Sequence, residues 1–594
     1  MKKKIIIDTE VYKDYFLLSA MEVDTGRIIN LEMYEGHPLD IERVNDLMRK
    51  YITIGFNSNK FDIPMLVAAV DGYDNDKLKG LCDSIIGSNA SMWSIYKTNK
   101  LNMQEDWNTI DLIEVAPGMV SLKIYGGRLN APTIQDLPIA PDASISPEQR
   151  EELRTYCKND LQTTKLLYDS LLPQITLRES MTAKYGIDLR SKSDAQIAEA
   201  VLASELTKIT KKELSRPNVK PTDTFRYLDP EIISFKSEQL DTILQRVVDQ
   251  KFTLGLNGAL TLPDWLKKEI IVINGRKYQM GIGGLHSCEK SQYINAPDDW
   301  FLQDRDVVSY YPSIILQQQV APKNMGKPFL ELYQGIVTER IAAKKQGDNV
   351  VANTLKIFLN GSFGKLGSKY SLLYAPDLLL QTTITGQLAL LMLIERMEEV
   401  GIQIVSANTD GVVCYAPKSL THECNAVAFE WELDTSYQLE TTDYVKLASR
   451  DVNNYLAVKT DGKVKGKGVF ASTGLAKNPD GSIVKTAVAL CVAKNIPVEK
   501  TIKECQDITQ FVTVRRVTGG AVWQDNYLGK AVRFYYSTEV PKDTCIHYAK
   551  NSNRVPMSGG GKPLMTLPNT FPSDVDYQVY VQMAHDLLKE VGYV

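Results

Sequence analysis

Closely paired cysteines are missing from this sequence of 594 residues. Its eight cysteines are scattered and include no C-x-x-C pair. Zinc ribbons and iron–sulfur sites need closely spaced cysteines, so we expect neither kind of site. Scattered cysteines favour a reducing compartment, and we expect the protein in the cytoplasm, which would be the host cytoplasm if it is viral.

A surplus of positive charge and long apolar runs are missing as well. Lysine and arginine number 68 against 72 acidic residues, which gives a net charge of −4. Proteins that bind nucleic acid often carry a basic surplus, so any DNA contact would need a locally basic groove. We identify no apolar run of 18 residues and no signal peptide in residues 2–8, and we therefore expect no membrane contact.

The composition that remains is that of an ordinary globular protein, with 44% hydrophobic and 24% charged residues. A chain of this length has room for about three or four domains. The informative features are therefore carboxylates and cations at particular spacings.

Residues 306–315 contain an acidic residue at the end of an apolar strand, which we expect to end at Asp306 and Val307. Pro312 predicts an extended or turn conformation for Tyr311, or it lies near the start of a following helix. A carboxylate at a strand end suits Mg²⁺, which takes few carboxylates together with substrate phosphates. Taken alone, such a stretch is more often structural than catalytic.

Three groups of acidic residues occur in the first 175 residues. Residues 5–10 are predicted to form a buried strand with residues 16–21 as its hairpin partner, so Asp8 and Glu10 point to one face. A second apolar strand covers residues 52–57, and a helix that contains Asp62 follows it.

The third group lies on a helix that is predicted to begin at Ser146. Ser146 is a suitable N-cap, Pro147 suits the first helical position, and Gln149 completes a capping box. Tyr156 and Asp160, four residues apart, then share one face of this helix.

Together these residues form a plausible cage for two divalent ions that hydrolyse a phosphodiester, with Tyr156 orienting the attacking water. Any one of the acids alone would be read as a solvated surface charge. The set resembles the three motifs of DnaQ-like 3′–5′ exonucleases. The resemblance implies an RNase H-like fold, an active proofreading site and contacts of two further residues with a frayed 3′ strand. The metal ligands would be Asp8, Glu10, Asp62 and Asp160, and the strand contacts Asn57 and Phe61.

Cations gather on two predicted helices farther along, at residues 331–345 and from about residue 350 to Phe363. Arg340 and Lys344 are four residues apart, and so are Lys356 and Asn360. Two antiparallel helices could direct these cations at one point and bind a triphosphate. A solvated charged face would give the same pattern.

Residues 403–415 are predicted to form a β-hairpin with Asp410 at its tip. With this element, the chain resembles the family B DNA polymerases through three ordered motifs. Motif A is Asp306 to Ser313, motif B is Lys356 to Gly364, and motif C is Asn408-Thr409-Asp410.

This second resemblance implies the roles of the polymerase residues. Asp306 and Asp410, with the Val307 carbonyl, would hold two metal ions. Tyr311 would reject a 2′-hydroxyl. The remaining contacts to the nucleotide would come from Ser309, Tyr310, Arg340, Lys344, Lys356, Asn360 and Gly364.

The chain departs from the family pattern at several positions. Asn408 replaces an acid and Gly411 a serine of motif C, while Phe363 replaces a tyrosine of motif B. Tyr455 of the primer-gripping element is retained without its lysine. The lysine could be replaced by Arg450, Lys465 or Lys467.

We thus expect an α+β and α/β multidomain protein, in which an RNase H-like exonuclease precedes a right-hand polymerase. The expected parts are an exonuclease domain (1–180), a linker with the first part of the palm (181–325), short two-helix fingers (326–365), the rest of the palm (366–470) and a thumb (471–594). In the thumb, residues 512–517 and 529–536 interleave basic and aromatic side chains. They form either a surface that follows a DNA backbone or half-exposed strands.

The expected activity is template-directed DNA synthesis with proofreading, as in the small bacteriophage enzymes, with two Mg²⁺ or Mn²⁺ ions at each site. Primer–template DNA and dNTPs would be the substrates of a monomer, with replication accessory proteins as further partners. Only 50 positions separate Asp306 from Lys356, which favours a nucleic-acid primer over a protein primer. Two alternatives stay open: an exonuclease whose polymerase half only binds DNA, and a non-catalytic DNA-binding scaffold.

Overall fold

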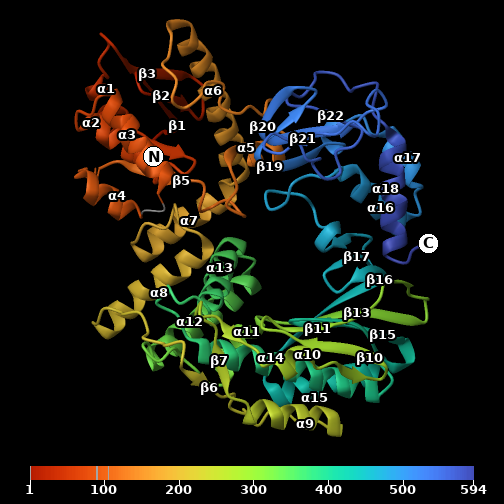
Figure 1. The fold of residues 1–594 in the computed structure, drawn as a ribbon. Coiled ribbons are helices and arrows are strands. Elements are labelled where there is room, and N and C mark those ends of the chain that lie inside the picture. Colours follow the sequence, from red (N-terminus) through yellow and green to blue (C-terminus); the bar gives the residue numbers. More distant parts are fainter. Residues whose placement is uncertain (1, 89–90, 103, 105) are drawn as a thin grey trace. The chain divides into compact units, whose positions relative to one another are not determined.

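The structure, a computed structural model, describes residues 2–88, 91–102, 104 and 106–594. The chain divides into two compact units, coloured by sequence in Figure 1. The first unit comprises Met1–Ser193, Thr473–Ile483 and Glu504–Tyr580, and the second comprises Asp194–Ser472, Val484–Lys503 and Val581–Val594. Residues 504–580, which we expected in a thumb, thus group with the N-terminal segment. The five-part division stays a prediction.

A five-stranded sheet forms the centre of the N-terminal segment. Its order is β3 (Ile28–Tyr34), β2 (Tyr15–Glu22), β1 (Lys4–Val11), β4 (Ile52–Gly55) and β5 (Asn108–Asp111). The predicted hairpin is confirmed, because β1 pairs antiparallel with β2; β4 is parallel to β1. The expected strand at 52–57 is two residues shorter than predicted.

Helices cover both faces of this sheet. Ile5 and Ile7 of β1 share a core with residues of α1 (Ile41–Lys50), α2 (Asp62–Val70) and α3 (Asn75–Gly87). Ile6 shares the opposite core with residues of α5 (Leu122–Arg128) and α6 (Pro147–Ser170). Because side chains alternate along a strand, Asp8 and Glu10 lie on the face of Ile6, toward α6. Helices α4 (Met92–Asn99) and α7 (Leu172–Tyr185) complete this segment.

Helix α6 begins with the predicted capping box. The Ser146 hydroxyl accepts from the Gln149 amide at 3.3 Å, and the Gln149 side chain accepts from the Ser146 amide at 2.9 Å. These two bonds satisfy donors that a helix start leaves free, and they set where the helix bearing Tyr156 and Asp160 begins.

The first unit also contains a four-stranded sheet from the C-terminal part of the chain. Its order is β21 (His547–Tyr548), β19 (Thr513–Trp523), β20 (Asn526–Tyr536) and β22 (Gly561–Pro563). The basic and aromatic residues at 512–517 and 529–536 therefore lie largely on paired strands. Arg533 has no exposed surface, which excludes it from any surface that follows DNA.

A ten-stranded sheet dominates the second unit. Its order is β18 (Val464–Gly466), β17 (Asn454–Lys459), β16 (Leu439–Asp451), β13 (Trp300–Val307), β15 (Gly411–Pro417), β14 (Gln403–Asn408), β11 (Leu285–Ser287), β10 (Arg276–Met280) and β9 (Ile271–Ile273), with β12 (Gln292–Asn295) on β16. The predicted hairpin around Asp410 is confirmed as β14 and β15. A small sheet is formed by β6 (Thr224–Phe225), β7 (Phe252–Leu254) and β8 (Leu260–Thr261).

Helices pack beside this sheet and supply its core. The predicted pair of cationic helices is confirmed as α12 (Lys327–Gln346) and α13 (Asn349–Lys365), which contact each other. The other helices of this part are α8 (Asp194–Thr210), α9 (Glu238–Asp249), α10 (Asp264–Lys268), α11 (Tyr310–Gln317), α14 (Pro376–Glu399), α15 (Thr421–Thr435) and α17 (Val498–Glu504). Helices α16 (Ser482–Lys494) and α18 (Tyr577–Glu590) contain residues of both units, as does α17, whose last residue, Glu504, belongs to the first unit.

These helices bear on two sequence expectations. Helix α14 is long and apolar enough to cross a membrane by length and composition, but 89% of its most apolar window is buried inside the structure. It is a core helix. The extended or turn conformation expected for Tyr311 is wrong, and the alternative, Pro312 near the start of a helix, is confirmed. Ser309 takes a left-handed conformation (φ 51°), and Pro312 lies in the first turn of α11, where a missing N–H costs little.

The capping box of α6 predicts a measurable loss of stability. Ser146→Ala should lower the free energy of unfolding of the first unit by about 1 kcal/mol, because it removes the acceptor for the Gln149 amide. Urea unfolding followed by circular dichroism measures the change. Ser180→Ala is the control, since that hydroxyl only bonds its own helix at Thr176, and an equal effect of both substitutions would contradict the capping role.

Candidate active sites

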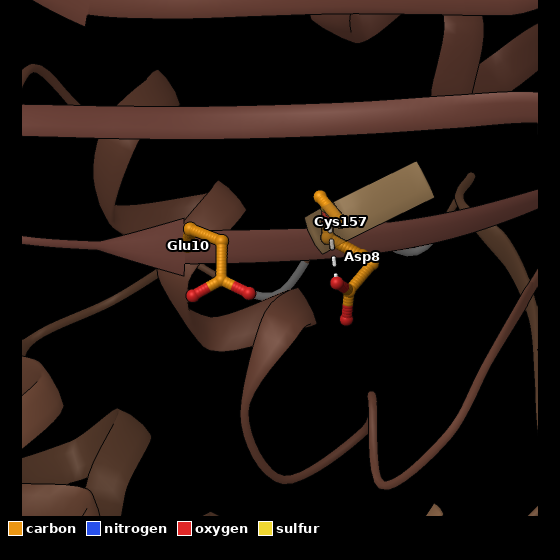
Figure 2. Close-up of side chains that lie close together, drawn as sticks. All are labelled: Asp8, Glu10 and Cys157. Carbon is orange, nitrogen blue, oxygen red and sulfur yellow. Dashed lines mark hydrogen bonds between the residues drawn. The ribbon is translucent and has the colours of Figure 1, made fainter. Parts of the chain in front are cut away.

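The first candidate site lies at β1. Its strand period directs Asp8 and Glu10 to the same face, and the Asp8 and Glu10 carboxylates lie close to Cys157 of α6 (Figure 2). One ligand atom from each of the three residues lies within 4.8 Å of the other two, a spacing that fits one metal ion. The Cys157 thiol donates to Asp8 Oδ2 at 3.1 Å. Sequence reasoning missed Cys157, although its position directly after Tyr156 could have drawn attention to it.

Asp62 and Asp160 join this cluster from two helices. Asp62, the first residue of α2, accepts from the Thr9 amide at 2.9 Å and from the Thr9 hydroxyl at 2.6 Å. Asp160 on α6 is buried and forms an ion pair with Lys123 of α5. The Lys123 ammonium also lies 4.4 Å from the centre of the Tyr156 ring. Lys123 was not predicted, because nothing in its local sequence marks it.

The electrostatics of the cluster favour a bound cation. Burial, followed by the charges of Asp160 and Asp62, raises the pKa of Asp8 well above its usual value. Burial and then the charge of Asp8 do the same to the pKa of Glu10. Burial also raises the pKa of Asp160, and it raises that of Asp62 to about 7. Oxygen ligands in this number suit Mg²⁺ or Mn²⁺, whose charge would remove the repulsion.

The two residues predicted to contact a 3′ strand lie beside Asp62. Phe61 directly precedes α2, and Asn57 has a left-handed backbone (φ 60°). The amides of Asn57 and Asn59 donate to the buried carboxylate of Asp111 at 2.8 and 2.9 Å. Asp111, which sequence reasoning also missed, therefore orders the loop that carries Asn57.

The second candidate site is a cavity of about 380 Å³ in the second unit. Residues of the three predicted polymerase motifs and of α12 line it, although they come from distant parts of the chain. The lining residues are Val307, Ser309, Tyr310, Tyr311, Pro312, Arg340, Lys356, Leu359, Asn360, Phe363 and Asp410. Of the residues predicted to bind a nucleotide, Lys344 and Gly364 do not line the cavity.

Asp306, a predicted metal ligand, does not line the cavity, but strand pairing holds it next to the segment that carries Asp410. Asp306 on β13 pairs with Gly411 on β15, and the Val307 amide donates to the Asp410 carbonyl at 2.7 Å. Burial and then the charge of Asp304 raise the pKa of Asp306 to about 6, and burial raises that of Asp410. A Cβ atom at position 411 would lie 2.3 Å from Asp306 Oδ1. Glycine at that position therefore leaves room for the Asp306 carboxylate.

The cations and the aromatic residues of the cavity are held by local contacts. Arg340 donates to the Ser309 hydroxyl. Lys344, which does not line the cavity, pairs with Glu440 at 3.1 Å. The ring of Tyr311 stacks on Phe363 with centroids 4.1 Å apart. The Tyr311 hydroxyl donates to the Gly283 carbonyl, in a glycine-rich turn that comes from far upstream in the sequence.

Of the cations predicted to grip the primer, Lys465 and Arg450 form ion pairs with carboxylates, and Lys467 does not within the described residues. The ammonium of Lys465 bonds the buried Asp304 carboxylate at 3.0 Å and the Tyr444 hydroxyl at 3.1 Å, so it compensates a buried charge. Lys467 lies 5.9 Å from the centre of the Tyr455 ring and makes no ion pair within the described part of the chain. Arg450 is paired with Asp451 and Glu590.

Asn408, the residue that departs from motif C, makes weak local bonds. Its Oδ1 accepts from the Thr409 hydroxyl at 3.1 Å, and its Nδ2 lies 3.5 Å from the Val452 carbonyl. An amide at this position therefore adds no negative charge next to Asp410.

No family model matches the chain. Over part of its length the chain is similar to DNA polymerases. It is 26% identical over 129 residues to DNA polymerase 1 of Sulfurisphaera ohwakuensis and 28% identical over 124 residues to DNA polymerase 1 of Saccharolobus solfataricus. These matches span 21% and 20% of this chain and only 14% of each relative. Among solved structures, the family B DNA polymerase of Pyrobaculum calidifontis aligns with a TM-score of 0.43 at 13% identity, over 100% of this chain and 78% of that one.

The raised pKa of Asp62 predicts how the metal-free protein responds to pH. The folded carboxyl keeps its proton up to about pH 7, whereas the unfolded carboxyl loses it near 3.8. This stabilising contribution is present below the unfolded pKa and is lost as the pH rises through about 7. In EDTA, the stability of the wild type should therefore fall from pH 4 to 7.5 more steeply than that of Asp62→Asn.

Thermal unfolding of both proteins across this pH range measures the difference. Mg²⁺ or Mn²⁺ at pH 7.5 should restore stability to the wild type. Parallel pH curves for the two metal-free proteins would contradict the assignment of the raised pKa to Asp62.

The tight space at Gly411 makes a second prediction. In Gly411→Ala the new Cβ must displace the Asp306 carboxylate, and a shift of about 1 Å at a reacting centre can cost 100-fold in rate. Extension of a primed template, the activity expected from the sequence, should fall by at least about tenfold in the variant. Gly335→Ala on α12 is the control, since nothing lies within 4 Å of its Cβ position. Full extension activity in Gly411→Ala would rule out this arrangement.

Proposed function

We propose that the protein is a template-directed DNA polymerase of family B that extends a primer with dNTPs and proofreads with a 3′–5′ exonuclease. The main support is the cavity at Asp410, where an aspartate, two cations and stacked aromatic rings converge from four chain segments. The local similarity to DNA polymerase 1 of two organisms adds to it. Because those matches cover a small part of each relative, the proposal of the whole activity rests on the residues of the site.

In the proposed polymerase site, the chain positions a triphosphate and a primer end. Asp306 and Asp410, with the Val307 carbonyl, would hold the metal ions. Arg340 and Lys356 would bind phosphate oxygens, since both line the cavity and Lys356 makes no ion pair within the described residues. The Tyr311 ring, fixed by Phe363 and Gly283, would lie under the sugar and exclude a 2′-hydroxyl.

In the proposed exonuclease site, metal ions would promote hydrolysis of a phosphodiester instead of nucleotide addition. Asp8, Glu10, Asp62 and Asp160 would hold the ions, and Tyr156 would orient the water. Bound Mg²⁺ or Mn²⁺ would supply charge neutralisation and an activated oxygen nucleophile at both sites. Lys123, paired with Asp160 and next to Tyr156, would hold both side chains in place and bring a positive charge to the scissile phosphate.

The finer assignments belong to the same proposal. They are the RNase H-like exonuclease, the palm, fingers and thumb, the likeness to small bacteriophage enzymes and the use of a nucleic-acid primer. Primer–template DNA and dNTPs would be the ligands, with replication accessory proteins as partners of a monomer in the cytoplasm.

A second candidate is an exonuclease whose polymerase half binds DNA without extending it. Asn408 favours it, because this neutral amide stands where the family pattern has an acid. Asp410 supplies the one carboxylate of that motif, so Asp306 carries more of the metal binding.

Primer extension on a primed template separates these functions. With Mg²⁺ and dNTPs the wild type should lengthen the primer, and without dNTPs it should shorten it. Asp410→Asn should abolish extension and keep degradation, whereas Asp8→Ala combined with Glu10→Ala should do the reverse, since each removes the metal ligands of one site. Degradation without any extension by the wild type would leave the second candidate, and binding without either reaction would leave a scaffold.

A further inference from the structure

Helix α5, which carries Lys123, packs on the C-terminal sheet of the first unit rather than only on the N-terminal segment. Ile124 of α5 and Ile134 share a buried cluster with Val514 of β19 and Ala531 of β20. At Gly127 of α5 a Cβ atom would lie 2.7 Å from a methyl carbon of Val514. The helix and the sheet are therefore in close contact, although about 390 residues separate Ile124 from Val514 in the sequence.

Arg533 of β20 holds the chain that follows α5. The residue has no exposed surface, and its guanidinium donates to four backbone carbonyls. The Ala131 and Pro132 carbonyls accept at 2.8 and 3.3 Å. Those of Leu564 and Met565 accept at 2.8 and 3.2 Å. Arg533 thus ties the loop after α5 to the segment beside β22.

Burying the Arg533 guanidinium costs free energy unless its N–H groups find acceptors. A buried guanidinium without a carboxylate needs its N–H groups satisfied, and four of its five donors have carbonyl partners here. Arg533 makes no ion pair within the described part of the chain. Removing the side chain would take a donor from four carbonyls, of which that of Ala131 is buried, at a free-energy cost.

Backbone bonds and a second arginine complete the attachment. The Ile134 amide donates to the Met565 carbonyl and the Leu567 amide to the Pro132 carbonyl, each at 2.8 Å. At the end of α5, Arg128 donates to Asn478 at 2.7 Å and to the Leu475 carbonyl at 2.6 Å. Residues 473–483 and 560–570 thus hold α5 and the loop that follows it.

We infer that the C-terminal sheet, through Arg533 and Val514, positions α5 and thereby Lys123 at the exonuclease carboxylates. Arg533 is then a positioning residue, since it touches neither the carboxylates nor a substrate. The inference rests on the proposed exonuclease, and it makes residues 504–580 part of that active unit. An exonuclease confined to residues 1–180 would lack the elements that place Lys123.

Arg533→Met tests the inference, because methionine keeps an apolar stem and removes every donor. Degradation of a primer should fall by at least about tenfold, since small displacements of catalytic groups are amplified in rate, while extension of a matched primer by the full-length protein is retained. Arg554→Met is the matched control, because Arg554 is exposed near the same sheet. A folded Arg533→Met with normal exonuclease activity would overturn the inference.

A double-mutant cycle distinguishes positioning from general loss of structure. If Arg533 acts through Lys123, then Arg533→Met should cause no further loss of exonuclease activity in a Lys123→Ala background. Multiplicative losses would contradict the coupling. Thermal unfolding of the four proteins checks that each one is folded at the assay temperature.

If Arg533→Met does not fold, a second pair of variants tests whether the C-terminal sheet positions α5. Gly127→Ala should push α5 away from Val514 and lower exonuclease activity, whereas adding Val514→Ala removes the clashing methyl carbons and should restore it. No loss in Gly127→Ala, or no recovery in the double variant, would overturn the inference. Absence of exonuclease activity in the wild type would instead refute the proposed function itself.

Discussion

Partial burial of carboxylates beside one another is the constraint on which both candidate sites depend. In the first unit, burial and mutual repulsion raise the pKa of Asp8 and Glu10 well above their usual values. In the second, burial and Asp304 raise the pKa of Asp306 to about 6. A fold keeps such groups together only when its other interactions outweigh this cost, and a bound divalent cation recovers much of it. The two sites thus share one electrostatic design on different sheets.

Strand geometry supplies the required rigidity. The two-residue period of β1 places Asp8 and Glu10 on one face, where α6 covers them with Cys157 and Asp160. Antiparallel pairing of β13 with β15 places Asp306 opposite Gly411, where any side chain would collide with the carboxylate. Compensating cations are built in nearby: Lys123 pairs with Asp160, and Lys465 pairs with Asp304. The positions of these lysines follow from charge balance as much as from substrate binding.

Local sequence patterns predicted the elements that depend on near neighbours. The hairpin around Asp410, the capped start of α6 and the pair α12 and α13 each follow from periodicity, turn residues or a capping box. Local patterns left other elements open. The extended conformation expected for Tyr311 is wrong, whereas the alternative, Pro312 near the start of a helix, is confirmed. The long apolar helix α14 lies in a protein core.

The sequence by itself determined which acids could form metal sites, because their spacing on strands and helices decides which of them share a face. Tertiary structure decided what surrounds those acids. Local sequence does not reveal the contacts of Lys123, Cys157 and Arg533, which include partners 37, 149 and about 400 positions away. An ion pair, a thiol donor and a buried guanidinium depend on geometry and desolvation in the folded chain. A linear sequence pattern shows neither the geometry nor the desolvation.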